Sequence, residues 1–253
     1  MLKTQRQKNL VDLILSNEVM SVADLSERLN TSMMTIRRDL DFLEQKGIIK
    51  KIHGGAVLIK NESNQPTFHE RIDEYSDLKQ RIGKEAVKLI KEGSVVFFDA
   101  GTTTLAAVDN LPEDLEFTAI TTGLMTAVAL CRKPKVNIVS IGGNIHCSSY
   151  SSTNHIAVDM IKSFNADMAF ISTKAFSLPQ GTYESLLQLI EVKRAIVSVS
   201  KKVVLLADHS KFESKSLSLS VPTKNINMII TDNLAPVKII DEIKKTGIEM
   251  IVV

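Results

Sequence analysis

The chain has 253 residues, a length that accommodates one large domain or two unequal ones. Apolar residues make up 44% of the sequence and the net charge is +2, which excludes a disordered chain and a strongly basic protein. No apolar stretch approaches the roughly 20 residues that span a bilayer, and the beginning of the sequence lacks the apolar core of a signal peptide. We therefore expect a cytoplasmic protein that does not enter the membrane.

Charge is distributed unevenly along the sequence. Residues 1–60 contain ten Lys/Arg and seven Asp/Glu, whereas the remainder contains 21 and 22. This mild asymmetry allows an N-terminal part that faces nucleic acid but does not prove one. The two cysteines, Cys131 and Cys147, match no metal-ligand spacing, so we expect reduced thiols, no metal site and no cofactor.

Three short helices are predicted at the start of the chain. The first covers about residues 4–16, and the second lies within residues 21–30 behind Ser21, a typical N-cap. The third is capped by Ser32 and ends at Gly47, and its buried stripe is expected to be Ile36, Leu40 and Leu43.

The free face of the third helix is polar. Two short helices joined by a tight turn are typical of a helix-turn-helix, whose second helix reaches base edges with its N-terminal half. Arginine suits guanine or phosphate, although an ordinary amphipathic helix with two solvated arginines remains an alternative for this helix alone. The predicted DNA contacts here are Ser32, Met33, Met34, Thr35, Arg37 and Arg38.

Residues 48–59 alternate in polarity and turn at Gly54-Gly55, which predicts a β-hairpin. Lys50, Lys51 and His53 would place charge on this hairpin near a phosphate backbone. Helices followed by a small hairpin form a winged helix, so residues 1–58 are predicted to be a DNA-binding domain. Residues 59–78 are polar, contain Pro66 and lack a clean period, so they are interpreted as a linker.

Residues 79–253 alternate between short apolar runs and helical patterns. This alternation predicts a largely parallel, three-layer α/β domain, in which ligands bind at the carboxyl ends of the strands. The expected strands are 95–99, 117–121, 137–141, 168–172, 203–208, 228–231 and 250–253.

The loop "DAGTTT", residues 99–104, follows the first of these strands. Gly101 lets the backbone approach a ligand, and the threonine hydroxyls and amides at a helix N-terminus can hold a phosphate. Lys193 and Lys211 could supply countercharge, and the carboxylates Asp99 and Asp208 could accept hydrogen bonds from sugar hydroxyls. A plain helix cap at the loop, a solvated Lys193 and a turn-capping Asp208 remain the alternatives.

Several of these motifs together resemble the DeoR family of bacterial transcriptional regulators. In the N-terminal part they are "TIRRDL" (35–40) and "HGGA" (53–56), and the resemblance implies a winged helix-turn-helix with Thr35, Arg37 and Arg38 at the DNA. The spacing of Phe68, Arg71 and Lys79 also resembles the junction that follows this domain in the family.

The C-terminal part resembles the effector domain of the same family. The matching motifs are "DAGTTT", "IGG" (141–143), "EVKRAI" (191–196), "DHSKF" (208–212) and "ITD" (230–232). The resemblance implies a fold similar to ribose-5-phosphate isomerase, glucosamine-6-phosphate deaminase and CoA transferases, and a phosphorylated sugar as effector. The contacting residues that it implies are Asp99, Gly101, Thr102, Thr103, Lys193, Asp208 and Lys211.

The chain departs from the family pattern in three places. "STKAFSLPQG" (172–181) stands where the family has a glycine-rich stretch, Thr121-Thr122 replaces Thr-Asn, and Gln188 and Leu189 replace acidic residues. These departures fall in the half of the site that would distinguish one sugar from another.

A sensor is favoured over an enzyme, because an enzyme on this scaffold needs a positioned general base. Asp99, Glu184 and Glu191 are available carboxylates, but none falls in an isomerase or deaminase signature. The resemblance suggests a repressor of a sugar-uptake or catabolic operon that binds double-stranded operator DNA, and a symmetric operator calls for a homo-oligomer. A sugar-phosphate enzyme tethered to DNA, and a regulator whose C-terminal domain only oligomerises, remain the alternatives.

Overall fold

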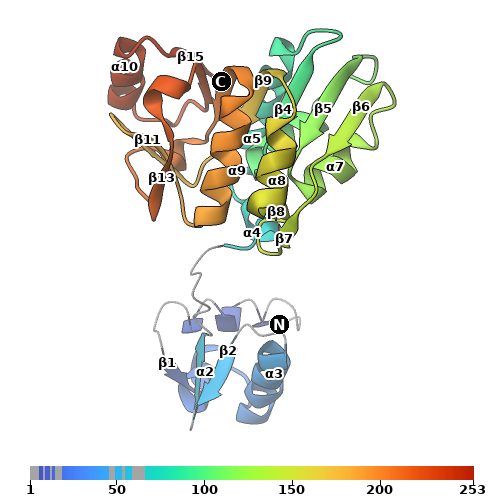
Figure 1. Ribbon diagram of the computed structural model, residues 1–253. Coiled ribbons are helices and arrows are strands. Elements are labelled where there is room, and N and C mark those ends of the chain that lie inside the picture. Colours follow the sequence, from blue (N-terminus) through green and yellow to red (C-terminus); the bar gives the residue numbers. More distant parts are fainter. Residues whose placement is uncertain are drawn as a thin grey trace. The chain divides into compact units, whose positions relative to one another are not determined.

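The computed structural model describes residues 6–7, 9–11, 13–14, 19–45, 49–52, 55–58 and 66–253. The chain divides into two compact units, Met1–Gln65 and Pro66–Val253 (Figure 1). Each unit is treated by itself below.

The N-terminal unit consists of short helices and a small sheet around one apolar core. Leu25, Ile36 and Leu40 are buried in this core together with Leu10 and Ile14 of the first helical segment. Ser21 caps α2 as predicted, and the hydroxyl of Ser32 accepts a hydrogen bond from the backbone of Thr35 in the first turn of α3. The elements are β1 (Val19–Ser21), α2 (Val22–Arg28), α3 (Met33–Gln45), β2 (Ile49–Ile52) and β3 (Gly55–Leu58).

The predicted hairpin is present as β2 and β3, which pair antiparallel. The structure adds β1, which the sequence did not predict, on the other side of β3. Three residues are too few to show an alternating pattern, so this pairing depends on the fold. The predicted helix end at Gly47 and the turn residue Gly54 lie outside the described residues.

The C-terminal unit is built on a seven-stranded parallel sheet with the order β15-β14-β12-β9-β4-β5-β6. The seven strands predicted from the sequence are confirmed, because strands buried on both faces appear as short apolar runs. Their bounds are β4 (Val95–Phe98), β5 (Phe117–Thr121), β6 (Val136–Ser140), β9 (Ala166–Ile171), β12 (Ser200–Leu206), β14 (Met228–Thr231) and β15 (Glu249–Val252).

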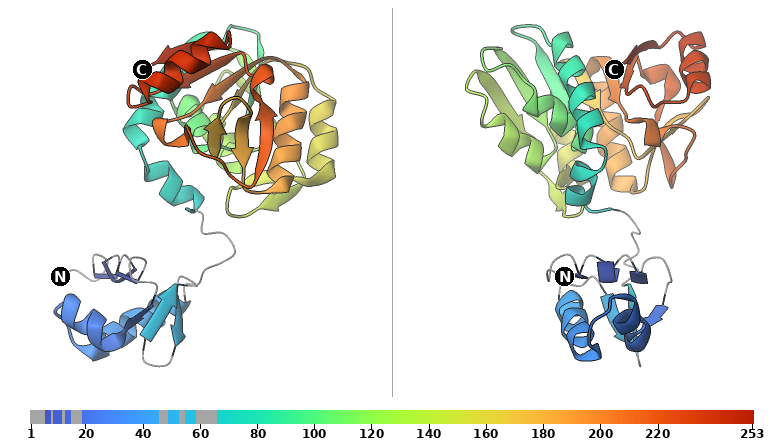
Figure 2. Two further views of the ribbon diagram at one scale, coloured as in Figure 1. Left: turned by 90° about the vertical axis from the view of Figure 1, so that its left-hand side faces the viewer. Right: turned by 180° about the vertical axis from the view of Figure 1, so that it is seen from behind.

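Helices cover both faces of this sheet and make the predicted three layers (Figure 2). Phe97 faces one apolar core with residues of α8, α9 and α10, whereas its neighbours Val96 and Phe98 face a second core with residues of α5, α6 and α7. This alternation follows from the two-residue period of a strand. The helices are α5 (Ser76–Ala86), α6 (Thr102–Asp109), α7 (Leu124–Leu130), α8 (Asn154–Lys162), α9 (Leu187–Ser198) and α10 (Val237–Lys245).

Two small antiparallel sheets follow the carboxyl ends of strands of the large sheet and were not predicted. One is the antiparallel hairpin of β7 (Asn144–His146) and β8 (Ser151–Thr153). Another is a sheet with the order β10-β11-β13, from Ala175–Ser177, Gly181–Glu184 and Ser218–Pro222. Single turns of 3-10 helix lie at Val87–Leu89, His209–Lys211 and Thr223–Asn225.

The second half of the predicted linker is helical. Helix α4 (Phe68–Asp73) begins at a capping box in which Thr67 and Glu70 bond each other's backbone amides. Phe68 is buried against Tyr150, with ring centroids 5.5 Å apart. Because a six-residue helix shows too few turns to give a clear period, the sequence pattern did not reveal it.

Candidate functional site

The candidate DNA-reading surface is the N-terminal half of α3. Met33 and Met34 are 51% and 60% exposed, and both Arg37 and Arg38 are exposed. Neither arginine forms an ion pair with any residue that the structure describes. Large side chains that are left free at a helix start are available to base edges and phosphates.

The opposite side of α3 is fixed to the first helical segment. Asp39 is 2% exposed and accepts hydrogen bonds from Arg6 at 2.6 Å and Gln7 at 3.0 Å. This pairing offsets the cost of burying the Asp39 carboxylate and sets the face that α3 leaves outward.

Of the three charged residues predicted on the hairpin, the structure describes the side chain of Lys51 alone. Lys51 is exposed, but its ammonium group bonds Asp41 and lies 3.4 Å from Glu44, so it is paired with α3. The hydrogen bond that Lys51 donates to Asp41 is the largest effect on its ammonium group and raises the pKa of Lys51. His53 and the side chain of Lys50 lie outside the described residues.

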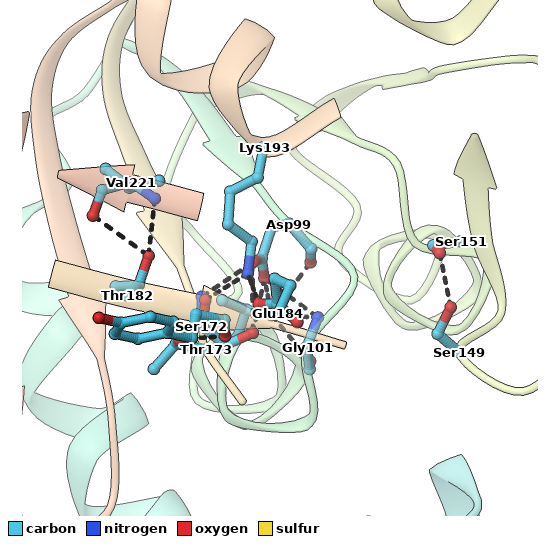
Figure 3. Close-up of polar contacts among 12 residues, drawn as sticks. Asp99, Gly101, Ser149, Ser151, Ser172, Thr173, Thr182, Glu184, Lys193 and Val221 are labelled. Carbon is cyan, nitrogen blue, oxygen red and sulfur yellow. Dashed lines mark hydrogen bonds and ion pairs between the residues drawn. The ribbon is translucent and has the colours of Figure 1, made fainter. Parts of the chain in front are cut away.

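In the C-terminal unit, Asp99 organises the loop between β4 and α6. Its carboxylate accepts hydrogen bonds from the amides of Gly101 at 3.0 Å and Ser172 at 2.8 Å, and from the Thr104 hydroxyl at 3.0 Å. Asp99 is buried, at 4% exposed. Figure 3 shows its contacts with Gly101 and Ser172. Asp99 is therefore a bonded part of the loop, and this network ties the end of β4 to the end of β9.

Lys193 projects from α9 into the same network. Its Nζ atom lies 3.3 Å from Asp99, 2.5 Å from Glu184 and 2.5 Å from the carbonyl oxygen of Ser172 (Figure 3). Burial lowers the pKa of the Lys193 ammonium, but the two carboxylates outweigh it and the pKa is raised overall.

Lys193 therefore has ion-pair partners within the protein that the sequence did not predict. A buried ammonium group needs charged partners, and the protein itself supplies two carboxylates. The solvated alternative is also excluded, because Lys193 is only 7% exposed. The sequence did not identify Glu184 as its partner, because β11 was not predicted.

The threonines of the loop divide into two kinds. Thr104 is fully used inside the loop, where its hydroxyl bonds Asp99 and the Gly101 carbonyl at 2.7 Å. Thr102 and Thr103 begin α6 and are 9% and 4% exposed. The first amides of a helix have no intrahelical acceptor, so the N-terminus of α6 offers donors to an anion.

Gly101 is required by packing. A Cβ atom there would lie 1.9 Å from the Oγ atom and 2.5 Å from the Cβ atom of Ser172. The glycine thus lets the loop lie against the end of β9.

Asp208 caps the turn at His209–Lys211, accepting hydrogen bonds from the Ser210 amide at 3.1 Å and hydroxyl at 2.5 Å. The carboxylate is fully buried, and its second oxygen, Oδ2, has no hydrogen-bond partner among the described residues. Lys211 is the nearest cation, 3.7 Å from Oδ2. The structure therefore shows the turn cap, and it also shows a buried oxygen that can still accept a hydrogen bond.

Three further cations surround the predicted site and were not assigned to it from the sequence. Lys79 is 3% exposed and donates hydrogen bonds to the carbonyl oxygens of Arg71 and Glu74, which end α4. Lys174 is half-buried, and its pKa is lowered first by burial and then by the charges of Lys211 and Arg71. In the sequence, Arg71 and Lys79 were noted only for a spacing that resembles the junction after the DNA-binding domain of the family.

Arg71 interacts electrostatically with Lys79, Lys174 and the nearby carboxylates. Burial lowers its pKa, while the charges of Glu184 and Asp99 partly offset the shift. Its Nε atom is buried and has no hydrogen-bond partner among the described residues. A buried guanidinium donor without an acceptor is costly, and an anionic ligand would satisfy it.

The residues that the structure describes contain no group of three or more His, Cys, Asp or Glu side chains arranged to hold a metal ion. They also include no helix whose length and apolar character would let it cross a bilayer.

Two family models match the chain, the DeoR-like helix-turn-helix domain over residues 6–62 and the DeoR C terminal sensor domain over residues 74–233. The HTH-type transcriptional regulator GolR of Listeria innocua is 35% identical over 229 residues, which cover 90% of each chain. The transcriptional repressor AccR of Agrobacterium fabrum is 30% identical over 229 residues, 90% of this chain and 89% of that protein.

Among solved structures, a ribose 5-phosphate isomerase from Methanocaldococcus jannaschii is similar over 54% of each chain, with 20% identity and a TM-score of 0.41. A likeness of this size says nothing about the chemistry of the site.

Proposed function

The chain belongs to the DeoR family of transcriptional regulators, and from that premise we propose that it represses a sugar-uptake or catabolic operon until a phosphorylated sugar binds its sensor domain. The relatives that match nine-tenths of the chain are named as regulators, so this protein is a DNA-binding regulator and not an enzyme. The operon, the direction of control and the effector are the parts that we propose.

The DNA-reading part of the proposal rests on α3. Arg37 and Arg38 are exposed beside Met33 and Met34, while Asp39 anchors the helix from behind. Arginines read guanine or phosphate, and methionine side chains can contact thymine methyl groups. An operator with two half-sites needs two copies of this helix, so we propose that the protein acts as a homo-oligomer.

The observation that carries the effector proposal is the unpaired Nε atom of Arg71. Arg71 lies in a cluster of cations, because the pKa of Lys174 is lowered first by burial and then by the charges of Lys211 and Arg71. Helix α4, which carries Arg71, packs against α6, whose N-terminus holds Thr102 and Thr103. Cations and free helix amides around one point favour a phosphate group.

The sugar would be held by the polar groups next to this point. Asp208 keeps one buried carboxylate oxygen without a hydrogen-bond partner, and that oxygen can accept a hydrogen bond from a hydroxyl group. Asp99, Gly101 and Lys193 shape the floor of the site, because their mutual contacts fix the loop that begins α6. We thus propose that Asp99, Gly101 and Lys193 hold the loop in position, whereas Arg71 and Lys211 pair with the negative charge of the effector.

The test compares hexose and pentose monophosphates with the same sugars lacking phosphate, by calorimetry on the full-length protein. We expect at least one sugar phosphate to bind, its unphosphorylated form to bind at least about tenfold more weakly, and Arg71→Gln to remove most of this difference. Arg132→Gln removes an exposed arginine of the same unit and is the matched control, which should bind like the wild type. If no phosphorylated sugar binds, a C-terminal domain that only oligomerises becomes the better account.

A further inference from the structure

The hairpin of β7 and β8 is hydrogen-bonded to the segments that follow β5 and β6, at the sheet edge where we propose that the effector binds. The amide of Ser152 donates to the carbonyl of Thr122 at 2.8 Å, next to the end of β5. Its hydroxyl donates to the carbonyl of Ile141 at 2.6 Å, next to the end of β6. Ligands of parallel sheets bind at this edge, so the hairpin stands where one wall of the site is expected.

Two close approaches place the hairpin against the groups already assigned to the site. Ser151 forms a β-bridge with Gly123, and a Cβ atom at Gly123 would lie 3.0 Å from the Cα atom of Ala100, inside the Asp99 loop. Tyr150 packs against Phe68, over whose ring the Arg71 guanidinium lies at 5.6 Å. The hairpin therefore borders both the α6 loop and the helix that carries Arg71.

A chain of hydrogen bonds holds one side chain of this hairpin in a fixed orientation. The Nδ1 atom of His146 lies 2.7 Å from the Ser149 hydroxyl, which lies 2.7 Å from the Ser151 hydroxyl. Both serines are buried, at 8% and 1% exposed, whereas His146 is half-buried. Figure 3 shows the serine pair as a set of contacts separate from the Lys193 network.

The chain of contacts leaves the other ring nitrogen available. No described residue bonds the Nε2 atom of His146. Burial and, after it, the charge of Arg71 lower the pKa of the ring, so His146 is neutral near pH 7. A neutral imidazole can donate or accept one hydrogen bond at Nε2, so a hydroxyl group, which can also do either, fits it in both tautomers.

We propose that His146, oriented by Ser149 and Ser151, binds a hydroxyl group of the sugar while Arg71 binds the phosphate of the same molecule. The inference rests on the proposed function and adds the residue that distinguishes one phosphorylated sugar from another. The charge of Arg71 acts on His146, and the charges of Glu184 and Asp99 act on Arg71, so Arg71 is coupled to both groups of side chains.

The test uses methyl phosphate, which has the charge but no hydroxyl, and the sugar phosphate that binds the wild type best in the hexose and pentose series. We expect His146→Ala to weaken the sugar phosphate about five- to tenfold and to leave the affinity for methyl phosphate within about twofold. Arg71→Gln should weaken both probes. His155→Ala, an exposed histidine on α8, is the matched control and should change neither.

A second variant separates binding from folding. Ser149→Ala keeps the ring but removes its hydrogen bond, so it should weaken only the sugar phosphate, by less than His146→Ala does, with an unchanged midpoint of thermal unfolding for the sensor unit. Equal losses for the two probes in His146→Ala, or no loss for either, would overturn the assignment of His146 and leave the phosphate site standing. Failure of the wild type to bind either probe would overturn the proposed function as well.

Discussion

The Nζ atom of Lys193 lies 2.5 Å from the Oε1 atom of Glu184, and the two side chains are only 8% and 9% exposed. Asp99 lies 3.3 Å from the same ammonium group. One buried cation thus joins α9, β11 and the loop after β4. The positive charge of Lys193 thus pairs with the protein's own carboxylates, which is why we propose Arg71 and Lys211 for the charge of the effector.

Removing this ammonium group should destabilise the sensor unit strongly. In Lys193→Met, two buried carboxylates remain without their cation, which costs about 3–5 kcal/mol of unfolding free energy. Lys201→Met is the matched control, because Lys201 pairs with Asp167 at 2.9 Å while 77% exposed, and its loss should cost less than about 1 kcal/mol. Urea denaturation of both variants measures the difference, and similar costs for the two would contradict the structural role of Lys193.

The same ion pairs predict how stability depends on pH. The pKa of Lys193 is raised above its usual value of 10.5 by Glu184 and Asp99, so the protonated form is favoured in the folded state. The contribution of Lys193 to the free energy of unfolding is therefore complete below pH 10.5. It is lost as the pH rises through the higher pKa that Lys193 has in the folded protein. In urea titrations between pH 7 and about 11, the wild type should lose stability at the alkaline end more steeply than Lys193→Met. Parallel curves for the two proteins would argue against a raised pKa.

The contact between Gly101 and Ser172 predicts a rescue. Gly101→Ala should destabilise the sensor unit by about 1–3 kcal/mol, because the new Cβ atom would overlap the Ser172 side chain. Adding Ser172→Gly removes that side chain and should recover part of the loss, whereas Ser172→Gly alone should be mildly destabilising. A double-variant cycle without any coupling would show that another contact, and not Ser172, requires the glycine.

The exposed arginines of α3 predict the specificity of DNA binding. Arg37→Ala and Arg38→Ala should each weaken operator binding by about 1–3 kcal/mol at fixed salt, and loss of a base-reading arginine should also relax the sequence preference. Fluorescence anisotropy with a duplex selected from a random pool measures both effects. Arg132→Ala removes the same charge from the sensor unit and should leave binding unchanged. Wild-type affinity in both α3 variants would refute their role.

The sheet and the helix-turn-helix could be predicted because their signals are local. Val95–Phe98 is a short apolar run and Ile36, Leu40 and Leu43 repeat at helical spacing, and both patterns follow from burial. The strand with His146 has three residues and the strand with Glu184 has four, and the pairing partner of each decides whether such a short segment becomes a strand. The positions of these short strands depend on the rest of the fold, so the local sequence pattern does not predict them.

The candidate site was predictable only as a region, for a related reason. The positions of Asp99 and Asp208 at strand ends follow from the order of elements, so the edge of the sheet could be identified. Which charges pair within the protein depends on distances between segments, so the ion pairs of Lys193 with Glu184 and Asp99 could not be predicted from the sequence. Arg71 is on a helix within the predicted linker, where a charged residue has the pattern of a solvated one.

The most direct test of the whole account is operator affinity, measured by anisotropy, with and without a saturating sugar phosphate from the hexose and pentose series. Linkage requires an effector that releases DNA to bind the DNA-bound protein more weakly by the same factor. The account predicts that the operator dissociation constant of the wild type rises at least about tenfold with the sugar phosphate, while Arg71→Gln binds the operator normally and is not released. An operator affinity that stays constant while the sensor unit is demonstrably occupied would contradict it.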